Sequence, residues 1–189
     1  QFYTAIENYN GAVRLNKTNV AAYINRGISY RRTEQFDLAI TDFNTVLRLD
    51  PNNAFTHPNR GLSFLGKQNY KRALEDFSEA IRRNPNDATA YFGRGRARFF
   101  SGLYDGAISD FKTLVSLGPN DPFGSIWLYL SQIRSGRDGR QDLAANAARF
   151  VGTRWPGPIY EMLLGQKSRS RRSQDLGAVV KKPAGDDRI

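Results

Sequence analysis

The chain repeats itself with a period of 34 residues. Four residue types keep this spacing, each in three copies: Gly27, Gly61 and Gly95; Ala39, Ala73 and Ala107; Phe43, Phe77 and Phe111; and Pro51, Pro85 and Pro119. A fixed period of this length indicates an array of similar units, each of which buries its apolar face only against its neighbours.

The pattern resembles the tetratricopeptide repeat (TPR), a helix pair with a small residue at position 8, alanine at 20, an aromatic residue at 24 and proline at 32. On that numbering, full repeats span residues 20–53, 54–87 and 88–121. The resemblance implies an all-α fold, a right-handed α-α superhelix or TPR solenoid. Proline at position 32 is expected to end each second helix.

Residues 1–19 match the second helix of a truncated repeat, since Ala5 and Ile6 precede Ala39 and Ile40 by one period. We therefore expect further residues upstream of this chain. A solenoid end that lacks a cap exposes an apolar face, which favours self-association. A homodimer through this exposed end is one expectation.

The small residues predict close packing inside each repeat. A glycine in a helix interior costs about 1 kcal/mol relative to alanine, so three in register imply a steric need. We expect the alanines at position 20 to supply the matching small surface, and the aromatic residues at position 24 to fill the volume that remains.

Arginine and aspartate recur as well, at positions 7 and 23. They are Arg26, Arg60 and Arg94, and Asp42, Asp76 and Asp110. We predict a ladder of ion pairs with a structural role, because removing one partner of a buried pair strands the other charge. The spacing leaves open whether each arginine meets the aspartate of its own repeat or of the preceding one.

After residue 121 the repeat degrades. Residues 122–151 are predicted to form a modified fourth helix pair, with an apolar helix over 123–133 and an alanine-rich helix over 141–150. Residues 152–167 are expected to form a C-terminal capping helix. The arginine- and serine-rich segment 168–189 is interpreted as a basic tail that is mobile or loosely docked.

This C-terminal region resembles bacterial TPR lipoproteins of the new-lipoprotein-I type. The resemblance lies in Asp121-Pro122-Phe123, Trp127-Leu128-Tyr129-Leu130, Arg154-Trp155 and Leu163-Leu164-Gly165. It implies a dimeric envelope adaptor that presents cell-wall hydrolases to a periplasmic protease, with a cytoplasmic location as the alternative. The chain departs from the family in having no lipobox cysteine.

In TPR proteins the first helix of each repeat lines the concave surface, through positions 2, 5, 6, 9, 12 and 13. By this resemblance the predicted peptide-binding groove consists of Ile24, Asn25, Ile28, Arg32, Phe55, Asn59, Leu62, Phe92, Arg96 and Phe99. An apolar floor with a few polar groups suits a short peptide or a partner helix. The lysines of a carboxylate clamp are absent from positions 5 and 2.

The two asparagines at position 6 support two interpretations. Family members use asparagine there to hydrogen-bond the main chain of an extended peptide. Asn-Arg-Gly is also the common sequence of this repeat subtype, in which case the apolar groove residues pack against their neighbours. Repeat three has Gly93 at this position.

Catalysis, a bound metal and a cofactor are not expected, because the chain has one histidine and no cysteine. The segment Gly61 to Lys67 mimics a phosphate-binding loop but lies in a helical hairpin. No apolar run reaches the length of a membrane-spanning helix.

The net charge of +10 makes nucleic acid or another anionic polymer the main alternative partner. Most aromatic residues fall at core positions, and no nucleic-acid-binding module is recognisable, so we favour a protein or peptide partner.

Overall fold

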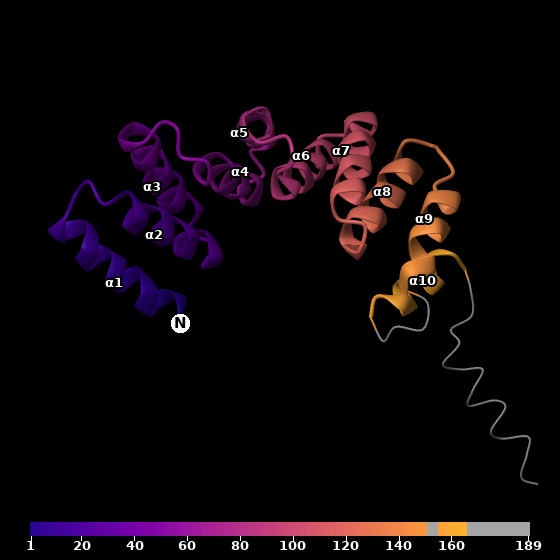
Figure 1. Cartoon of the computed structure of the whole chain (residues 1–189), viewed down its shortest axis with the longest axis horizontal. Helices are drawn as coiled ribbons and strands as arrows, with labels where there is room; N and C mark the ends of the chain where they lie inside the picture. The colour runs from indigo at the N-terminus through magenta and orange to yellow at the C-terminus, as the bar shows by residue number, and fades with distance from the viewer. Residues whose placement is uncertain (151–154, 166–189) are drawn as a thin grey trace, which may run out of the picture. The chain divides into compact units, whose positions relative to one another are not determined.

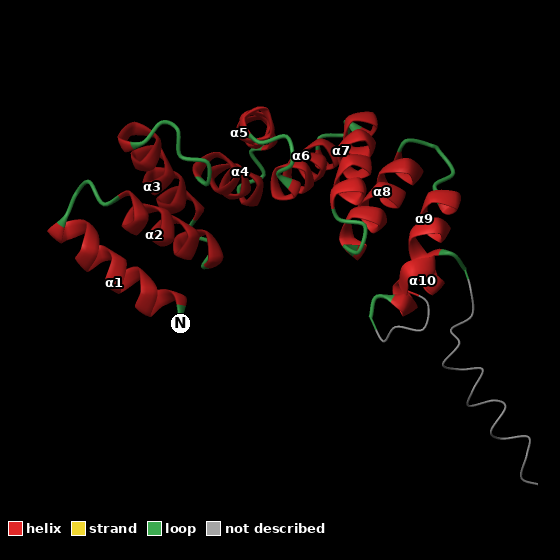
Figure 2. Cartoon of the chain, in the orientation of Figure 1, coloured by secondary structure: helices red, strands yellow, loops and turns green. Residues whose placement is uncertain are grey.

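The computed structural model describes residues 1–150 and 155–165, and all regular secondary structure in these residues is helical (Figure 2). The helices are α1 (Phe2–Leu15), α2 (Val20–Arg32), α3 (Phe36–Leu49), α4 (Thr56–Gly66), α5 (Tyr70–Arg83), α6 (Ala88–Phe100), α7 (Tyr104–Leu117), α8 (Pro122–Arg134), α9 (Arg140–Ala147), the 3-10 turn η1 (Ala148–Phe150) and α10 (Gly157–Leu163). The expected all-α class is confirmed.

The chain divides into two compact units, Gln1–Arg137 and Asp138–Ile189. The first unit holds α1 to α8. The boundary falls between the two helices of the predicted fourth pair, so that pair and its capping helix stay predictions. In the described part of the second unit α9 contacts α10, and Tyr160 is buried with its ring stacked on Phe150 at 5.3 Å. The predicted tail 168–189 lies outside the described residues.

Helices α1 to α8 follow one another along an arc (Figure 1). Each helix packs against the next in sequence. The first helices of successive repeats also contact one another, α2 with α4, α4 with α6 and α6 with α8. Within residues 1–137, all of which are described, the second helices α3, α5 and α7 make no comparable contact with each other. The first helices therefore form the inner row of a right-handed TPR superhelix.

Tight turns join the two helices of each full repeat, and the same position carries the left-handed residue every time, as it does after α8. It is Glu34 (φ 61°), Gln68 (φ 57°) and Gly102 (φ 76°) in the repeats, and Gly136 (φ 80°) after α8. The amide of the following residue donates to a carbonyl five residues back, as Gln35 N does to Tyr30 O at 2.8 Å. This C-cap pattern satisfies helix-end carbonyls and reverses the chain. Only two of the four positions use glycine, the residue with the least steric penalty there.

The core is built on the phenylalanines at position 24. These rings fill the space beside the glycines, as predicted, whereas the expectation that alanines supply the surface facing the glycines was wrong. Phe43, Phe77 and Phe111 are completely buried. The atoms closest to each position-8 glycine belong to the phenylalanine ring of its own repeat, not to an alanine. A Cβ on Gly61 would lie 2.9 Å from Phe77. Because glycine has no side chain, the flat phenylalanine ring can lie directly against the helix backbone.

The predicted ion-pair ladder is present, and each arginine pairs within its own repeat. Arg26 donates two hydrogen bonds to Asp42 (2.8 and 2.7 Å), and Arg60 makes the same fork with Asp76. The remaining guanidinium nitrogen reaches the preceding repeat, as Arg60 Nη1 donates to Asn44 Oδ1 at 2.7 Å. Each arginine thus joins two repeats, which fixes their mutual orientation.

Candidate binding groove

A pocket of about 310 Å³ lies between the inner helices α2 and α4. Its lining consists of Ala21, Ile24, Asn25, Ile28, Phe55 and Asn59. Five of these side chains were predicted as groove residues from their repeat positions. The pocket follows from helix periodicity, since residues 21, 24, 25 and 28 of α2 share one face.

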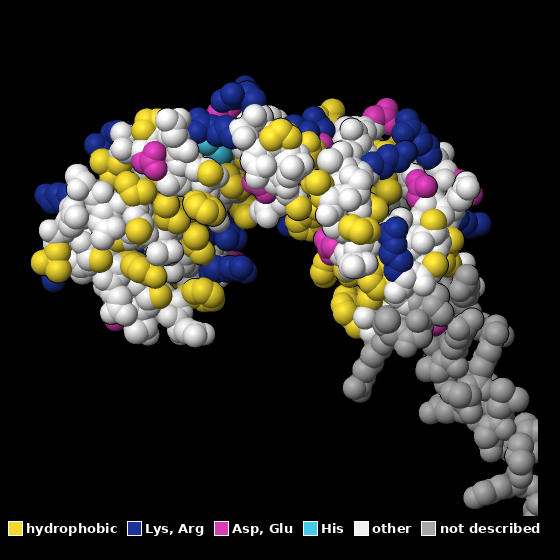
Figure 3. All heavy atoms as spheres, viewed as in Figure 1, with side chains coloured by type: hydrophobic (Ala, Val, Ile, Leu, Met, Phe, Trp, Pro, Cys, Tyr) yellow, Lys and Arg dark blue, Asp and Glu magenta, His cyan; other side chains and the backbone are white. Residues whose placement is uncertain are grey.

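A second pocket of about 360 Å³ continues along the inner row between α4, the end of α5 and the start of α6. Phe55 and Asn59 line both pockets, and Leu62 joins them in the second. Figure 3 shows Lys and Arg side chains projecting from the α2 end into the hollow beside the inner helices. We call the two pockets together the groove. Phe55 and Asn59 lie where the two pockets adjoin.

The start of α4 explains why Phe55 stands free. Asn53 Oδ1 accepts from the amide of Phe55 and from the hydroxyl of Thr56, which delays the helix to Thr56. Pro58 therefore falls in the first turn, where its missing N–H costs no helical hydrogen bond. The Phe55 ring is left 68% exposed.

The two groove asparagines differ in what they offer a ligand. Asn25 is exposed, and its side-chain amide forms no hydrogen bond with any described residue. Asn59 is half-buried and donates to the carbonyl of Phe55 at 2.7 Å, while its oxygen lies 3.5 Å from Nη2 of Arg31. Asn25 therefore keeps its full hydrogen-bonding capacity, and Asn59 keeps one N–H and part of its carbonyl.

The predicted groove residues of repeat three lie in an aromatic cluster. Phe99 meets the ring of Trp127 edge-on at 5.2 Å. The guanidinium of Arg96 lies over the rings of Phe92 (5.6 Å) and Trp127 (5.8 Å). Burial lowers the pKa of Arg96 below its ordinary value. These three side chains contribute packing, and none of them lines the two pockets. Arg32, on the last turn of α2, is exposed and lines neither pocket.

Sequence reasoning missed Arg31. This residue follows Ile24 and Ile28 at helical spacing, and so lies on the face of α2 that borders the first pocket. Its position-12 register was a usable signal, but the adjacent Arg32 was chosen. The structure also gives a steric reason for the departure at position 6 of repeat three: a Cβ on Gly93 would lie 2.2 Å from Phe77.

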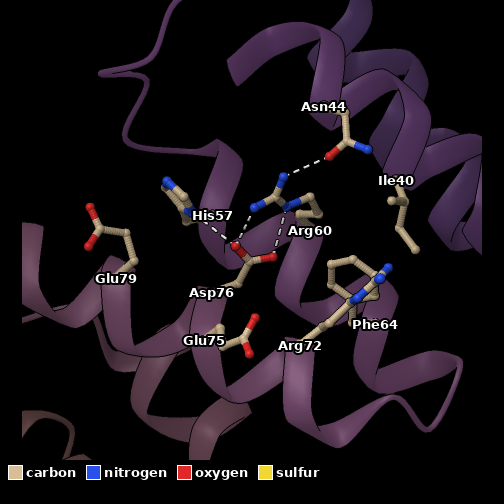
Figure 4. A pocket seen from close by; sticks show the side chains of 9 residues that line it. All are labelled: Ile40, Asn44, His57, Arg60, Phe64, Arg72, Glu75, Asp76 and Glu79. Carbon is tan, nitrogen blue, oxygen red and sulfur yellow. Dashed lines mark hydrogen bonds and ion pairs between the residues drawn. The ribbon is translucent and has the colours of Figure 1, made fainter. Parts of the chain in front are cut away.

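A third cavity, of about 400 Å³, lies away from the groove between α3, α4 and α5 (Figure 4). His57, the single histidine of the chain, lines this cavity, and its Nδ1 lies 2.9 Å from Asp76 Oδ1. Asp76 thus takes hydrogen bonds from His57 and from the Arg60 fork. Because Arg60 also donates to Asn44 of the preceding repeat, this group of side chains joins two repeats and has a structural role. Among the described residues, no cluster of His, Cys, Asp or Glu could hold a metal ion.

Glu79, at the edge of this cavity, is expected to titrate far below a normal glutamate. Hydrogen bonds from Arg82 and Arg83 lower its pKa from 4.5 to about 2. Because the folded pKa is depressed, the contribution of this carboxylate to stability is present above pH 4.5 and is lost as the pH falls towards 2. Side-chain carbon NMR of Glu79 against pH checks this. Titration near the ordinary value in the native protein would contradict it, and Arg82→Gln with Arg83→Gln should restore that value.

Comparison with family models gives two matches, at residues 20–53 and 59–122, and both models are described as "Tetratricopeptide repeat". No match to the curated proteins was found. None of the described helices is long and apolar enough to cross a membrane.

Several solved structures share the fold. MamA of Desulfovibrio magneticus RS-1, residues 41 to the end, is 23% identical over 92% of this chain and 88% of that one, with a TM-score of 0.71. YrrB, described as "a TPR protein with an unusual peptide-binding site", is 20% identical over 86% and 82%, with a TM-score of 0.67. The second TPR domain of human RPAP3, in complex with the HSP70 peptide SGPTIEEVD, is 27% identical over 58% and 92%, with a TM-score of 0.56.

Proposed function

We propose that this chain, a tetratricopeptide-repeat protein, is a non-enzymatic adaptor that holds a peptide segment or a helix of a partner protein against α2, α4 and α6. The observation that carries the proposal is the pair of adjoining pockets that share Phe55 and Asn59. An exposed aromatic ring beside side-chain amides with hydrogen-bonding capacity to spare is a combination that anchors a peptide and sets its register.

The similar structures support this role at a coarse level. The RPAP3 domain was solved with a peptide, and YrrB is described with a peptide-binding site. Stacked repeats hold the groove residues on rigid helices, so the receptor loses little conformational entropy when a ligand docks.

The sequence resemblance to new-lipoprotein-I type proteins makes the proposal more specific. The more specific proposal is a bacterial envelope adaptor that dimerises through α1. The apolar side chains of Phe2, Tyr3 and Leu15 are exposed on this helix. Sedimentation analysis tests the dimer. A monomer at all concentrations would remove this part and leave the groove proposal intact.

The double change Asn25→Ala and Asn59→Ala is expected to weaken partner binding by about tenfold, because each lost hydrogen bond contributes roughly 0.5–1.5 kcal/mol. The partner is first identified by affinity capture and mass spectrometry. Affinity is then measured by calorimetry, and thermal unfolding is recorded beside it, where we expect little change.

The matched control is Asn8→Ala with Asn120→Ala, two exposed asparagines outside the pockets. This control should bind as the native protein does. Unaltered affinity of the groove variant would exclude both asparagines from the site. Tight binding of a short single-stranded oligonucleotide at physiological salt, with no protein captured, would favour the nucleic-acid alternative.

A further inference from the structure

Beside the groove lies a cation, Arg31, that has no counter-ion among the described residues. Arg31 is half-buried, and its guanidinium makes a single long contact, 3.5 Å from Nη2 to the amide oxygen of Asn59. Its Nε is buried without any hydrogen-bond partner. Among the described residues, no carboxylate lies within 4.0 Å of it.

Four of the other partly buried arginines of the inner helices have a counter-ion. Arg26, Arg60 and Arg94 each meet an aspartate at 2.7–2.8 Å, and Arg98 also pairs with Asp110. Arg96 resembles Arg31 in having a buried Nε without a partner and no carboxylate within 4.0 Å among the described residues, but its guanidinium lies over two aromatic rings, a contact that Arg31 does not have among these residues. Burial, and to a smaller degree the charge of Arg32, lower the pKa of Arg31. A desolvated charge without a partner is costly, so its retention points to a partner supplied from outside.

We propose that Arg31 binds a carboxylate of the partner peptide beside the pocket between α2 and α4. The side-chain oxygen of Asn59 accepts a hydrogen bond from Arg31 and supports the guanidinium in this position. This inference rests on the proposed function and specifies its ligand as a segment with an acidic group next to apolar residues. The site differs from a lysine clamp at positions 5 and 2, which here hold residues such as Ile24 and Phe55. A planar guanidinium is suited to take a carboxylate through two parallel hydrogen bonds.

An acidic peptide fits better than a phosphate backbone. The first pocket is lined by Ala21, Ile24, Ile28 and Phe55 apart from its two asparagines. Such a surface suits apolar side chains flanking one carboxylate. A nucleic acid would need a track of cations along its backbone.

The test uses random short peptides as the probe, selected on the native protein, on Arg31→Met and on Arg48→Met. Arg48 is an exposed arginine on the second helix α3, so its loss changes the net charge equally. We expect the native protein and Arg48→Met to select peptides with Asp or Glu at one fixed position, and Arg31→Met to lose that preference. Selected peptides should lose about tenfold in affinity for Arg31→Met.

Two library arms distinguish the source of the carboxylate. Peptides with amidated C-termini test side-chain carboxylates, and peptides with free C-termini test a terminal one. Binders without acidic preference in either arm, or a preference that survives Arg31→Met, would overturn this inference while leaving the peptide-binding function intact. A library that yields no binders would overturn both.

Thermal unfolding of Arg31→Met gives a readout that needs no ligand. Because methionine keeps the aliphatic packing and removes an uncompensated charge, we expect the melting temperature to stay equal or rise. A clear fall in melting temperature would assign Arg31 to the packing of α2 on α4 and would overturn the proposal.

Discussion

Replacing Phe77 with alanine is expected to lower the free energy of unfolding by about 3–5 kcal/mol, the usual cost of emptying a buried aromatic site. The ring is completely buried and lies against two glycines, Gly61 of its own repeat and Gly93 of the next. Its loss therefore leaves a cavity inside one repeat and at the interface with another. Urea denaturation followed by circular dichroism measures the change.

Phe55→Ala is the control, because that ring is 68% exposed. It should change stability by less than about 1 kcal/mol. Equal losses for the two variants would show that the position-24 ring is not the centre of the repeat core.

A double-mutant cycle with Gly93→Ala tests the contact itself. A Cβ at Gly93 would lie 2.2 Å from the Phe77 ring, so the single change should destabilise the native protein by overpacking. In the Phe77→Ala background the space is free and the same change should cost much less. Additive effects would mean that the two residues do not share this contact.

Replacing Asp110 with alanine is expected to cost about 3–5 kcal/mol, since it strands two partly buried guanidinium groups. The Asp110 side chain is 1% exposed, and it pairs with Arg94 at 2.7 Å and with Arg98 at 2.8 Å. The arginine side chains are only 16% and 27% exposed, so water cannot fully replace the lost carboxylate. Equilibrium unfolding in urea again gives the number.

Asp105→Ala makes the same chemical change on the same helix. Asp105 pairs with Arg137, but both side chains are mostly exposed, at 77% and 56%. An exposed pair contributes about 0–1 kcal/mol, so this variant should remain near native stability. If Asp110→Ala were as mild as Asp105→Ala, the ladder would be a surface feature without a structural role.

The groove shows which binding residues can be predicted from their positions in the repeat and which cannot. Positions on one helix share a face by periodicity alone, which is why Ile24, Asn25 and Ile28 were predicted together and do line one pocket. In repeat three the predicted residues do not line the two pockets, because the ring of Trp127 packs against Phe99 and under the guanidinium of Arg96. Such contacts join helices distant in sequence, and their geometry is not contained in a single repeat.

The sequence by itself determined the period, the helix pairs and the identity of the ladder residues, because burial and helix geometry constrain each repeat locally. The tertiary structure decided which repeat each arginine joins, why Gly93 has no side chain and that Arg31 has no counter-ion in the part of the chain that the structure describes. These facts depend on how neighbouring helices stack, since distances of a few ångströms across an interface decide whether a ring fits or a charge is paired. One-dimensional spacing does not fix those distances.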